Sequence, residues 1–444
     1  MKVIIAGAGI GGLTAALSLH AAGIDVEVFD GVRAIQPLGV GINCLPHAVR
    51  ELTELGLGEQ LLRIGVATRE LVYTNRLGQR IWQEDRGRHA GYHWPQVSIH
   101  RGRLQTLLFE TALERLGPQR LHLDHALAGF EQDAQGVTAQ FVSRAVSSGS
   151  SQAAREAAPE RPAARASVRG DLLIGADGIH SALRRTLQPQ EGPPIWNGAI
   201  LWRGMSLARP FLSGASMVMA GHEWQKFVCY PISAPRDDGL QEINWIAELK
   251  YRDRPALQRE DWNRPGRLED FLPAFEAWDF GWLDAPGLIR SAAQCFEFPM
   301  VDRDPLPQWR QGRVTLLGDA AHPMYPIGSN GASQAILDAR VLSWRLATEA
   351  DPLHALERYE EERRPATAAI VLANRRNGPE KVMQMAQERA PDGFGHVHEV
   401  ISAAELAAAA QEYKLVAGFD REQLNSRASY SVTRNAESRA TGDP

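Results

Sequence analysis

The sequence has 444 residues, of which 44% are hydrophobic, and a formal net charge of −5. This length suits two or more domains with sizeable cores, and the slightly acidic balance excludes the basic surface by which proteins bind nucleic acid or an anionic membrane. Three cysteines, Cys44, Cys229 and Cys295, are too few and too far apart for a disulfide framework or a metal site, so we expect buried thiols in a reducing cytoplasm and no bound metal.

The first thirty residues have the pattern of a strand, a glycine turn, a helix and a second strand. The apolar run 2–6 is followed by Gly7, Gly9 and Gly12, and Asp30 ends the second strand. Gly7 allows a tight turn, Gly9 lets the backbone approach a pyrophosphate, and Gly12 lets the helix pack closely on the sheet. The helix N-terminus would face the phosphates, while the Asp30 carboxylate would accept from ribose hydroxyls and repel a 2′-phosphate. The pattern therefore predicts an ADP moiety without a 2′-phosphate, as in NAD or FAD.

An apolar N-terminus is also typical of a signal peptide or a membrane anchor. Four glycines interrupt the run from residue 3 to residue 19, and no small-residue cleavage site follows it. A membrane-spanning helix needs about 20 mostly uninterrupted apolar residues. We therefore expect a cytoplasmic protein that does not span a membrane.

The periodicity of apolar residues predicts the next elements. After a glycine-rich loop over 37–43, expected to lie close to a ligand, the pattern predicts a helix to Leu55, strands within 71–99, a helix over 101–116 and a strand over 137–142. The stretch 143–166 is rich in Ser, Ala, Arg and Glu without an apolar period, so we expect a disordered excursion.

The second half of the chain alternates between two kinds of pattern. Short strands rich in Trp, Phe and Tyr, over 199–205, 226–232 and 243–249, predict a separate antiparallel sheet. Buried strands before Asp177 and Asp319 restore the pattern of the first domain. A long helix over 332–346, mostly helical residues over 355–417 and a frayed polar tail from Ser426 complete the prediction.

Three strand-to-turn motifs recur in one order. They are Gly-Ala-Gly-Ile-Gly-Gly from Gly7, Gly-Ala-Asp-Gly from Gly175 and Gly-Asp-Ala-Ala-His-Pro from Gly318. Together they resemble the single-component FAD-dependent aromatic hydroxylases, the family of para-hydroxybenzoate and salicylate hydroxylases, from residue 1 to roughly residue 375. The resemblance implies an α/β fold in which a Rossmann-like FAD-binding domain is interleaved with a mixed or antiparallel-sheet substrate domain and followed by C-terminal helices.

The expected boundaries are 1–72, 98–190 and 294–375 for the FAD-binding domain, 73–97 and 191–293 for the substrate domain, and 376–444 for a C-terminal helical region and tail.

The resemblance also implies the cofactor contacts. Asp319 would bind the FAD ribityl chain, although by itself it could be an ordinary helix cap. Asp177 and Gly178 would lie where the pyrophosphate and the incoming nicotinamide are handled. The helix that begins near Ala332 would point its N-terminus at the flavin pyrimidine edge and stabilise the anionic reduced flavin. The complete set of expected cofactor-binding residues is Gly7, Gly9, Gly12, Asp30, Arg101, Asp177, Gly178, Asp319, Gly328, Asn330, Gly331 and Ala332.

A further group of motifs is similar to the phenazine hydroxylase that forms pyocyanin. These motifs are the stretches 37–43, 98–102, 202–204, 301–307 and 319–338. Two departures put the substrate in doubt: residues 377–419 do not match that enzyme, and Ser333 stands where many relatives have glycine.

The implied reaction is hydroxylation of an aromatic or heteroaromatic compound by NAD(P)H and O2 through a flavin C4a-hydroperoxide. We expect a multi-ring or carboxylated substrate of the phenazine or quinoline type, because aromatic strands could sandwich a flat ring and Arg203 could bind a carboxylate. The expected substrate-binding residues are Trp202, Arg203, Tyr230, Trp245, Met324 and Pro326. No catalytic residue is identified, and both a monomer and a homodimer remain open.

Weaker patterns favour ordinary structure over function. His396 and His398, in a glycine-rich loop without further ligands, are expected to face solvent rather than bind metal. Asp302 and Asp304 are expected to form structural ion pairs. Three alternatives stay open: a flavin reductase, oxidase or halogenase on the same scaffold, an NAD-dependent dehydrogenase that purifies colourless, and a non-catalytic FAD-binding protein.

Overall fold

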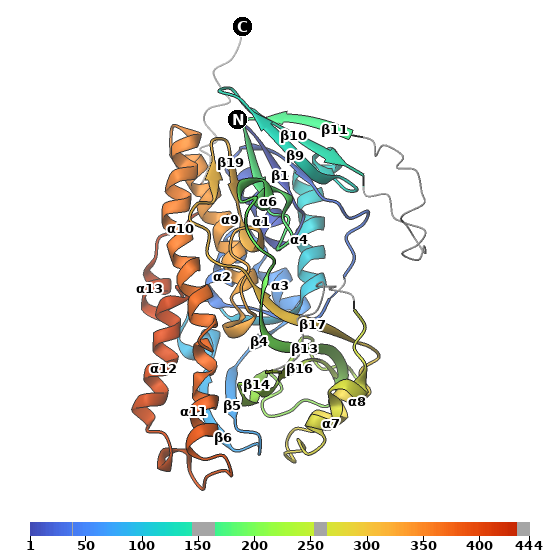
Figure 1. Ribbon diagram of the computed structural model, residues 1–444, viewed down its shortest axis with the longest axis vertical. Helices are drawn as coiled ribbons and strands as arrows, with labels where there is room; N and C mark the ends of the chain where they lie inside the picture. The colour runs from blue at the N-terminus through green and yellow to red at the C-terminus, as the bar shows by residue number, and fades with distance from the viewer. Residues whose placement is uncertain (38, 144–164, 253–263, 433–444) are drawn as a thin grey trace.

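In the computed structural model, residues 1–37, 39–143, 165–252 and 264–432 can be described. The predicted disordered excursion at 143–166 lies almost entirely outside this part of the chain. Figure 1 shows a sheet-rich upper half, a second sheet below it, and helices from the end of the chain along one side of both.

A six-stranded sheet forms the centre of the upper half. Its strand order is β18 (Arg310–Gln311), β19 (Val314–Leu316), β12 (Leu172–Gly175), β1 (Lys2–Ala6), β2 (Asp25–Phe29) and β8 (Leu121–His122). All neighbours are parallel except β18 and β19. Val3, Ile4 and Ile5 are fully buried, as expected where both faces of a parallel sheet are covered.

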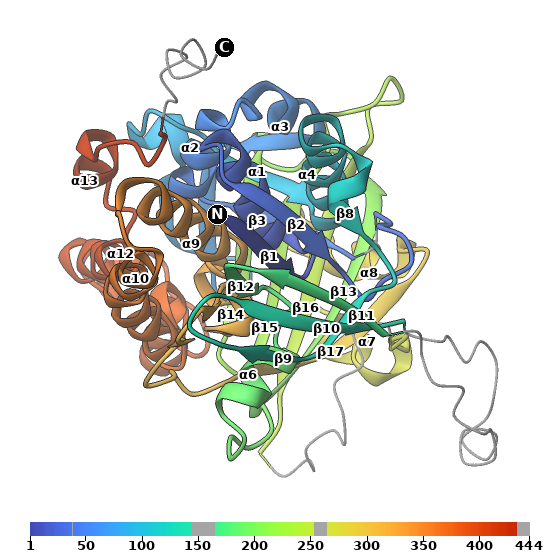
Figure 2. The same cartoon turned by 90° about the horizontal axis from the view of Figure 1, so that it is seen from above.

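Different layers cover the two faces of this sheet (Figure 2). On one side lie the helices α1 (Ile10–Ala21), α4 (Arg101–Leu116) and α9 (Gly331–Thr348), with α2 (Pro46–Glu54) and α3 (Gly58–Ile64) behind them. On the other side lies an antiparallel sheet of β9 (Ala126–Gln132), β10 (Val137–Val142) and β11 (Arg165–Gly170), next to α6 (Ala182–Leu187). These layers share one core, confirming the expected α/β architecture.

A seven-stranded sheet forms the lower half. Its order is β17 (Cys295–Asp302), β13 (Ile195–Ala208), β16 (Gln241–Lys250), β15 (Gln225–Pro231), β14 (Ser216–His222), β5 (Glu70–Thr74) and β6 (Arg80–Asp85). Only the β14–β5 pair is parallel. One face packs on α7 (Leu272–Phe275) and α8 (Ala285–Ser291). The other face packs on the end of the chain.

A small sheet of β3 (Gly41–Cys44), β7 (Gln96–His100) and β4 (Gly65–Thr68) joins the halves. Of the strands expected within 71–99, β5 and β6 enter the large sheet, whereas β7 pairs with β3 and β4. Short 3-10 turns make up the remaining elements, and they are η1 (Gly87–Ala90), η2 (Pro118–Arg120), η3 (Leu268–Asp270), η4 (Gly318–Ala320), η5 (Ile327–Ser329), η6 (Gly378–Glu380) and η7 (Val397–Glu399).

The last helices are α10 (Pro352–Asn374), α11 (Lys381–Arg389), α12 (Ala403–Val416) and α13 (Arg421–Ser426), drawn orange to red in Figure 1. Across the described ranges, no helix combines the length and apolar character that a membrane crossing requires.

The prediction of a frayed tail from Ser426 is wrong for residues 427–432. Arg427 pairs with Glu51, and the Tyr430 hydroxyl donates to Glu362 over 3.0 Å. Composition suggested a solvated tail, but its polar groups have specific charged partners on α2 and α10.

Two of the weaker patterns have clear structural roles. Arg375 donates to Asp302 over 2.7 and 2.9 Å and to Asp304 over 2.8 Å, which confirms the expected ion pairs. His396 accepts from the backbone N–H of His398 over 3.2 Å and caps η7. No cluster that could hold a metal ion is found among the described residues.

Candidate active site

The glycine turn after β1 contains two glycines that the fold itself requires. Gly7 has a φ of +115°, and a Cβ there would lie 2.2 Å from the Ala176 carbonyl oxygen. A Cβ on Gly12 would lie 2.0 Å from the Gly7 carbonyl oxygen. Gly9 differs, because its φ of −73° is ordinary and a Cβ there would meet no atom within 4 Å. The open space lies directly before the N-terminus of α1.

Asp30 organises the same turn. Its Oδ2 accepts from the backbone N–H of Ala8 over 2.6 Å, and its Oδ1 accepts from that of Val32 over 2.9 Å. The carboxylate therefore lies beside the glycine turn, where the sequence placed it.

Asp319 and Arg101 are close enough for their charges to interact, and we call the space at these two side chains the recess. Asp319 is exposed, and no hydrogen bond to its carboxylate is found within the described ranges. Burial in the surrounding protein nevertheless raises the pKa of Asp319, while the charges of His322 and Arg101 oppose that rise. Arg101 is also exposed, at the start of α4, where His100 Nδ1 accepts from the backbone N–H groups of Gly102 and Arg103. Asp319 and Arg101 thus place an acceptor and a donor of opposite charge near each other, both accessible to a ligand.

Asp177 binds the first backbone N–H of α6, whose N-cap is Ser181, through one of its two carboxylate oxygens. Its Oδ2 accepts from the backbone N–H of Ala182 over 2.7 Å at the start of α6. Its Oδ1 is buried and has no partner in the described part of the chain, and burial raises the pKa of the carboxyl. The neighbouring Gly178 has a φ of +78° and open space at its Cβ position.

The end of α12 fixes the loop before α9. Asn330 is fully buried, and its side chain donates to the Tyr413 hydroxyl over 2.9 Å. A Cβ on Gly328, whose φ is +68°, would lie 2.1 Å from the Tyr413 hydroxyl oxygen. Gly331 and Ala332 form the first turn of α9, and a Cβ on Gly331 would lie 4.0 Å from Asp319 Oδ1. The Asn330 side chain is therefore used in packing, so a ligand at this end of α9 would meet the backbone N–H groups that the first turn of a helix leaves unpaired.

Two of the expected substrate residues share a face of the large sheet. Arg203 lies against the Tyr230 hydroxyl, and its Nη2 donates to the Gly41 carbonyl over 2.8 Å. Burial raises the pKa of Tyr230 to about 12, although Arg203 opposes that rise.

Trp202 and Trp245 lie on the opposite face, because neighbouring residues of a strand point to opposite sides. Trp202 stacks on Phe271 with ring centroids 4.9 Å apart. Trp245 Nε1 donates to Ser206 over 3.0 Å. Both indoles are fully buried under α7 and α8, so the structure does not bring them into one wall with Tyr230.

Met324 and Pro326 also lie in different environments. Met324 is buried in a cluster with Leu45, Tyr413 and Phe419, whereas Pro326 is exposed before η5. Both residues precede η5 in the chain, and Pro326 is its N-cap.

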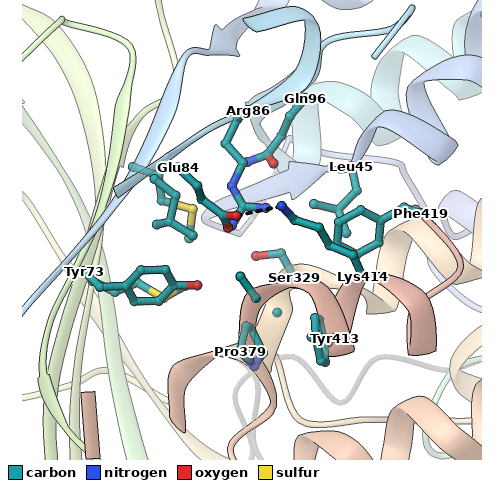
Figure 3. A pocket seen from close by; sticks show the side chains of 15 residues that line it. Leu45, Tyr73, Glu84, Arg86, Gln96, Ser329, Pro379, Tyr413, Lys414 and Phe419 are labelled. Atoms are coloured by element: carbon teal, nitrogen blue, oxygen red, sulfur yellow. Dashed lines mark hydrogen bonds and ion pairs between the residues drawn. The ribbon is translucent and has the colours of Figure 1, made fainter. Parts of the chain in front are cut away.

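A cavity that the sequence did not reveal lies on the Tyr230 face of the sheet, against α12 (Figure 3). Its volume is about 20 Å³ of space for the centres of water molecules, and the wider atom-free space of about 400 Å³ includes open solvent at the mouth. Its apolar lining includes Leu45, Leu71, Met217, Met219 and Phe419, and its polar lining includes Tyr73, Glu84, Arg86, Gln96, Ser329 and Lys414. Alternation along β5 and β14 predicts one face for Leu71 with Tyr73 and for Met217 with Met219. No sequence signal connects these strands to Lys414.

Ser333, one of the two departures that the sequence analysis noted, is fully buried. Its hydroxyl accepts from the backbone N–H of Leu45 over 3.1 Å, which ties α9 to the start of α2 beside the cavity.

Comparisons with known proteins identify the family to which the chain belongs. A family model described as an FAD binding domain matches residues 1–264 and 295–374. The chain is 45% identical over 376 residues to phenazine 1,6-dicarboxylic acid hydroxylase PhzS of Lysobacter antibioticus, covering 84% of this chain and 89% of that protein. It is 28% identical to 3-hydroxybenzoate 6-hydroxylase 1 of Aquipseudomonas alcaligenes, with coverages of 83% and 86%.

Solved structures share the fold. A salicylate hydroxylase in a substrate complex superposes with a TM-score of 0.70 at 22% identity, covering 98% of this chain and 99% of that one. HpxO of Klebsiella pneumoniae, complexed with FAD and uric acid, gives a TM-score of 0.69 at 24% identity and covers 96% of each chain.

Proposed function

Because the chain belongs to the FAD binding domain family and its relatives are FAD-dependent hydroxylases of aromatic compounds, we propose that it uses NAD(P)H and O2 to hydroxylate a multi-ring, carboxylated heteroaromatic compound. FAD-dependent hydroxylation of an aromatic substrate is its general activity. The finer substrate class rests on one observation, the 45% identity over 84% of the chain to a hydroxylase of a phenazine dicarboxylic acid.

The overall reaction balances without a metal. One ring C–H becomes C–OH with one oxygen atom of O2, and the other oxygen atom leaves as water. NAD(P)H supplies two electrons and, with one further proton from solvent, becomes NAD(P)⁺.

The residues of the recess fit FAD. The open space at Gly9 lies at the N-terminus of α1, where backbone N–H groups and the helix dipole favour a pyrophosphate. Asp319 and Arg101 have side chains exposed in the recess to accept from and donate to a polyhydroxyl chain and a phosphate. The spare Oδ1 of Asp177 provides a further acceptor. When bound, FAD supplies the electron transfer and oxygen activation that side chains cannot perform.

The chain's own residues would hold and orient the ring system. Leu71, Met217 and Met219 give the cavity an apolar wall, on which a flat ring would pack once the lining side chains move apart to admit it. Ser329 and Gly328 line the same cavity and continue into the first turn of α9. That turn would place backbone N–H groups where negative charge develops on the cofactor. The cavity and the recess thus meet at the loop before α9.

The visible absorption spectrum of the purified protein, followed by NAD(P)H oxidation assays with phenazine-1,6-dicarboxylate, tests this proposal. We expect flavin absorption bands and NAD(P)H consumption that increases when the compound is added. A colourless protein that cannot be reconstituted with FAD would contradict the cofactor assignment. A yellow protein whose NAD(P)H oxidation responds to no multi-ring acid, but does respond to single-ring phenols, would contradict the substrate class.

A further inference from the structure

One end of the cavity carries three charged side chains from separate parts of the chain (Figure 3). Lys414 Nζ of α12 lies 2.7 Å from Glu84 Oε2 of β6. Arg86 Nη2, just after β6, lies 2.5 Å from Glu84 Oε1. Two cations thus share one carboxylate, and this end of the cavity has a net charge of +1.

The same end contains buried polar atoms that the described residues leave without partners. Arg86 is 9% exposed and Tyr73 and Gln96 are each 2% exposed. Arg86 Nε, the Tyr73 hydroxyl and Gln96 Oε1 have no hydrogen-bond partner in the described ranges. Buried polar groups in folded proteins are normally paired with protein, water or ligand. Two of these three atoms are donors, and Figure 3 shows the Tyr73 hydroxyl directed into the cavity.

The Glu84 carboxylate remains charged at neutral pH. Burial works to raise the pKa of Glu84, but Arg86 and Lys414 outweigh burial and lower it, so the carboxylate stays ionised. A monoanionic ligand group would therefore neutralise this end of the cavity and accept from the spare donors. A carboxylate has two oxygens that accept hydrogen bonds in this way, and pairs of this kind are charge-assisted.

We propose that this end of the cavity binds a carboxylate of the aromatic substrate through Arg86 and Lys414, and that α12 thereby sets the preference for acids over neutral rings. This inference rests on the proposed function. It draws on α12, which begins at Ala403, outside the residues that the FAD binding domain model matches.

The position of Lys414 is coupled to the loop beside the cofactor recess. The neighbouring Tyr413 hydroxyl donates to the Asn374 side chain over 2.8 Å and accepts from Asn330 over 2.9 Å. These contacts fix α12 against η5, so Lys414 enters the cavity from a rigid support. Arg203, the carboxylate partner that the sequence suggested, is instead held by the Gly41 carbonyl on another part of the same sheet face.

The test measures binding rather than turnover. FAD-loaded protein is titrated with phenazine-1-carboxylate and with phenazine-1-carboxamide, a neutral compound of nearly the same shape, and Kd is obtained from the change in flavin absorption and by calorimetry. Wild type should bind the acid more tightly than the amide. Lys414→Met should weaken acid binding about ten- to a hundredfold, the value of one charge-assisted bond, and change amide binding less than about twofold. Lys414→Arg should restore most of the preference.

Two controls separate this subsite from general effects. Lys381→Met removes a lysine of α11 that pairs, on the outer surface, with Glu412 of α12, the helix that carries Lys414. This variant should leave both Kd values unchanged. Arg203→Met should keep the acid-over-amide ratio. The proposal is overturned if Lys414→Met keeps the wild-type ratio, if Arg203→Met loses it, or if the FAD-loaded wild type binds neither compound. If the ratio depends on Lys414 but no aromatic acid is hydroxylated, the subsite stands and the proposed function fails.

Discussion

His322 Nε2 and Asp338 Oδ2 lie 2.5 Å apart in the core directly behind the Asp319 turn. Both side chains are buried, and Asp338 also accepts from Arg363 over 2.7 Å and from the backbone N–H of Gly318 over 3.1 Å. Asp338 thus ties η4 and α10 to α9. This network holds the turn that presents Asp319 to the recess.

We predict that Asp338→Asn destabilises the protein by roughly 3 to 5 kcal/mol, because it leaves the charge of Arg363 buried without its partner. Urea unfolding of the FAD-free protein at pH 7 measures the loss. A change below about 1 kcal/mol, the usual value of an exposed pair, would contradict the structural role.

The carboxyl group of Asp338 should also make the stability of the protein depend on pH below pH 4. Burial alone would raise its pKa, but His322 and Arg363 outweigh burial and lower it from 3.8 to about 2. A carboxyl whose pKa is lower in the folded chain than in the unfolded chain stabilises the fold at pH values above its unfolded pKa. That stabilisation is lost as the pH falls through the folded pKa. We therefore predict a loss of about 2 kcal/mol between pH 4 and pH 2 that Asp338→Asn does not show. Unfolding curves across that range give the comparison, and parallel curves would refute it.

Between pH 6.5 and pH 5, His47 should be the main cause of the loss of stability. Burial, with the charges of Arg363 and Arg427, lowers its pKa from 6.5 to about 3. The unfolded chain then binds a proton below pH 6.5 that the folded chain excludes, so stability falls as pH falls from 6.5 toward 3. We predict about 2 kcal/mol lost between pH 6.5 and pH 5.

The matched variant is His47→Gln, which keeps a polar group near Gln334 but cannot titrate. Its stability curve should be flatter by that amount over the same interval. An equal slope in both proteins would show that other groups cause the acid sensitivity.

Two glycines of one turn should respond in opposite ways to the same substitution. Gly9→Val places its side chain in open space, so we predict a folded protein that no longer binds FAD. Gly12→Val clashes with the Gly7 carbonyl and should not fold. Circular dichroism and flavin absorption of both variants decide the matter; a yellow Gly9→Val protein would show that the space before α1 does not hold the pyrophosphate.

Asp319→Ala should weaken FAD binding about ten- to a hundredfold, the cost of one lost charge-assisted hydrogen bond. The fold should persist, because Asp319 has no hydrogen-bonded partner among the described residues. Fluorescence titration of the apoprotein with FAD, alongside thermal unfolding without FAD, separates the two effects. Wild-type affinity, or unfolding comparable to that of Asp338→Asn, would contradict the assignment.

Local patterns predicted most of the fold. The helix expected over 101–116 matches α4, because His100 caps it and Gly117 ends it. The glycine spacing likewise identified the turn around Gly7. These features depend on neighbours in sequence, which periodicity and turn chemistry report directly.

The predicted substrate residues divide between the two faces of the large sheet, and long-range packing decides which layer covers each face. Trp202 and Arg203 are adjacent, so at most one could face the cavity, and the sequence did not indicate which face α7 and α8 would cover. The charged end of the cavity joins Glu84 to Lys414, which are 330 positions apart. Only the docking of α12 brings that pair together.

Turnover under ¹⁸O2 tests the central claim most directly. FAD-loaded protein is supplied with NAD(P)H and phenazine-1,6-dicarboxylate, and the product is analysed by mass spectrometry against NAD(P)H consumed. We predict a product that gains one labelled oxygen atom, with at least one NAD(P)H oxidised per product formed. NAD(P)H consumption without a labelled product from this or any other aromatic compound would contradict the hydroxylase account and indicate an oxidase or reductase.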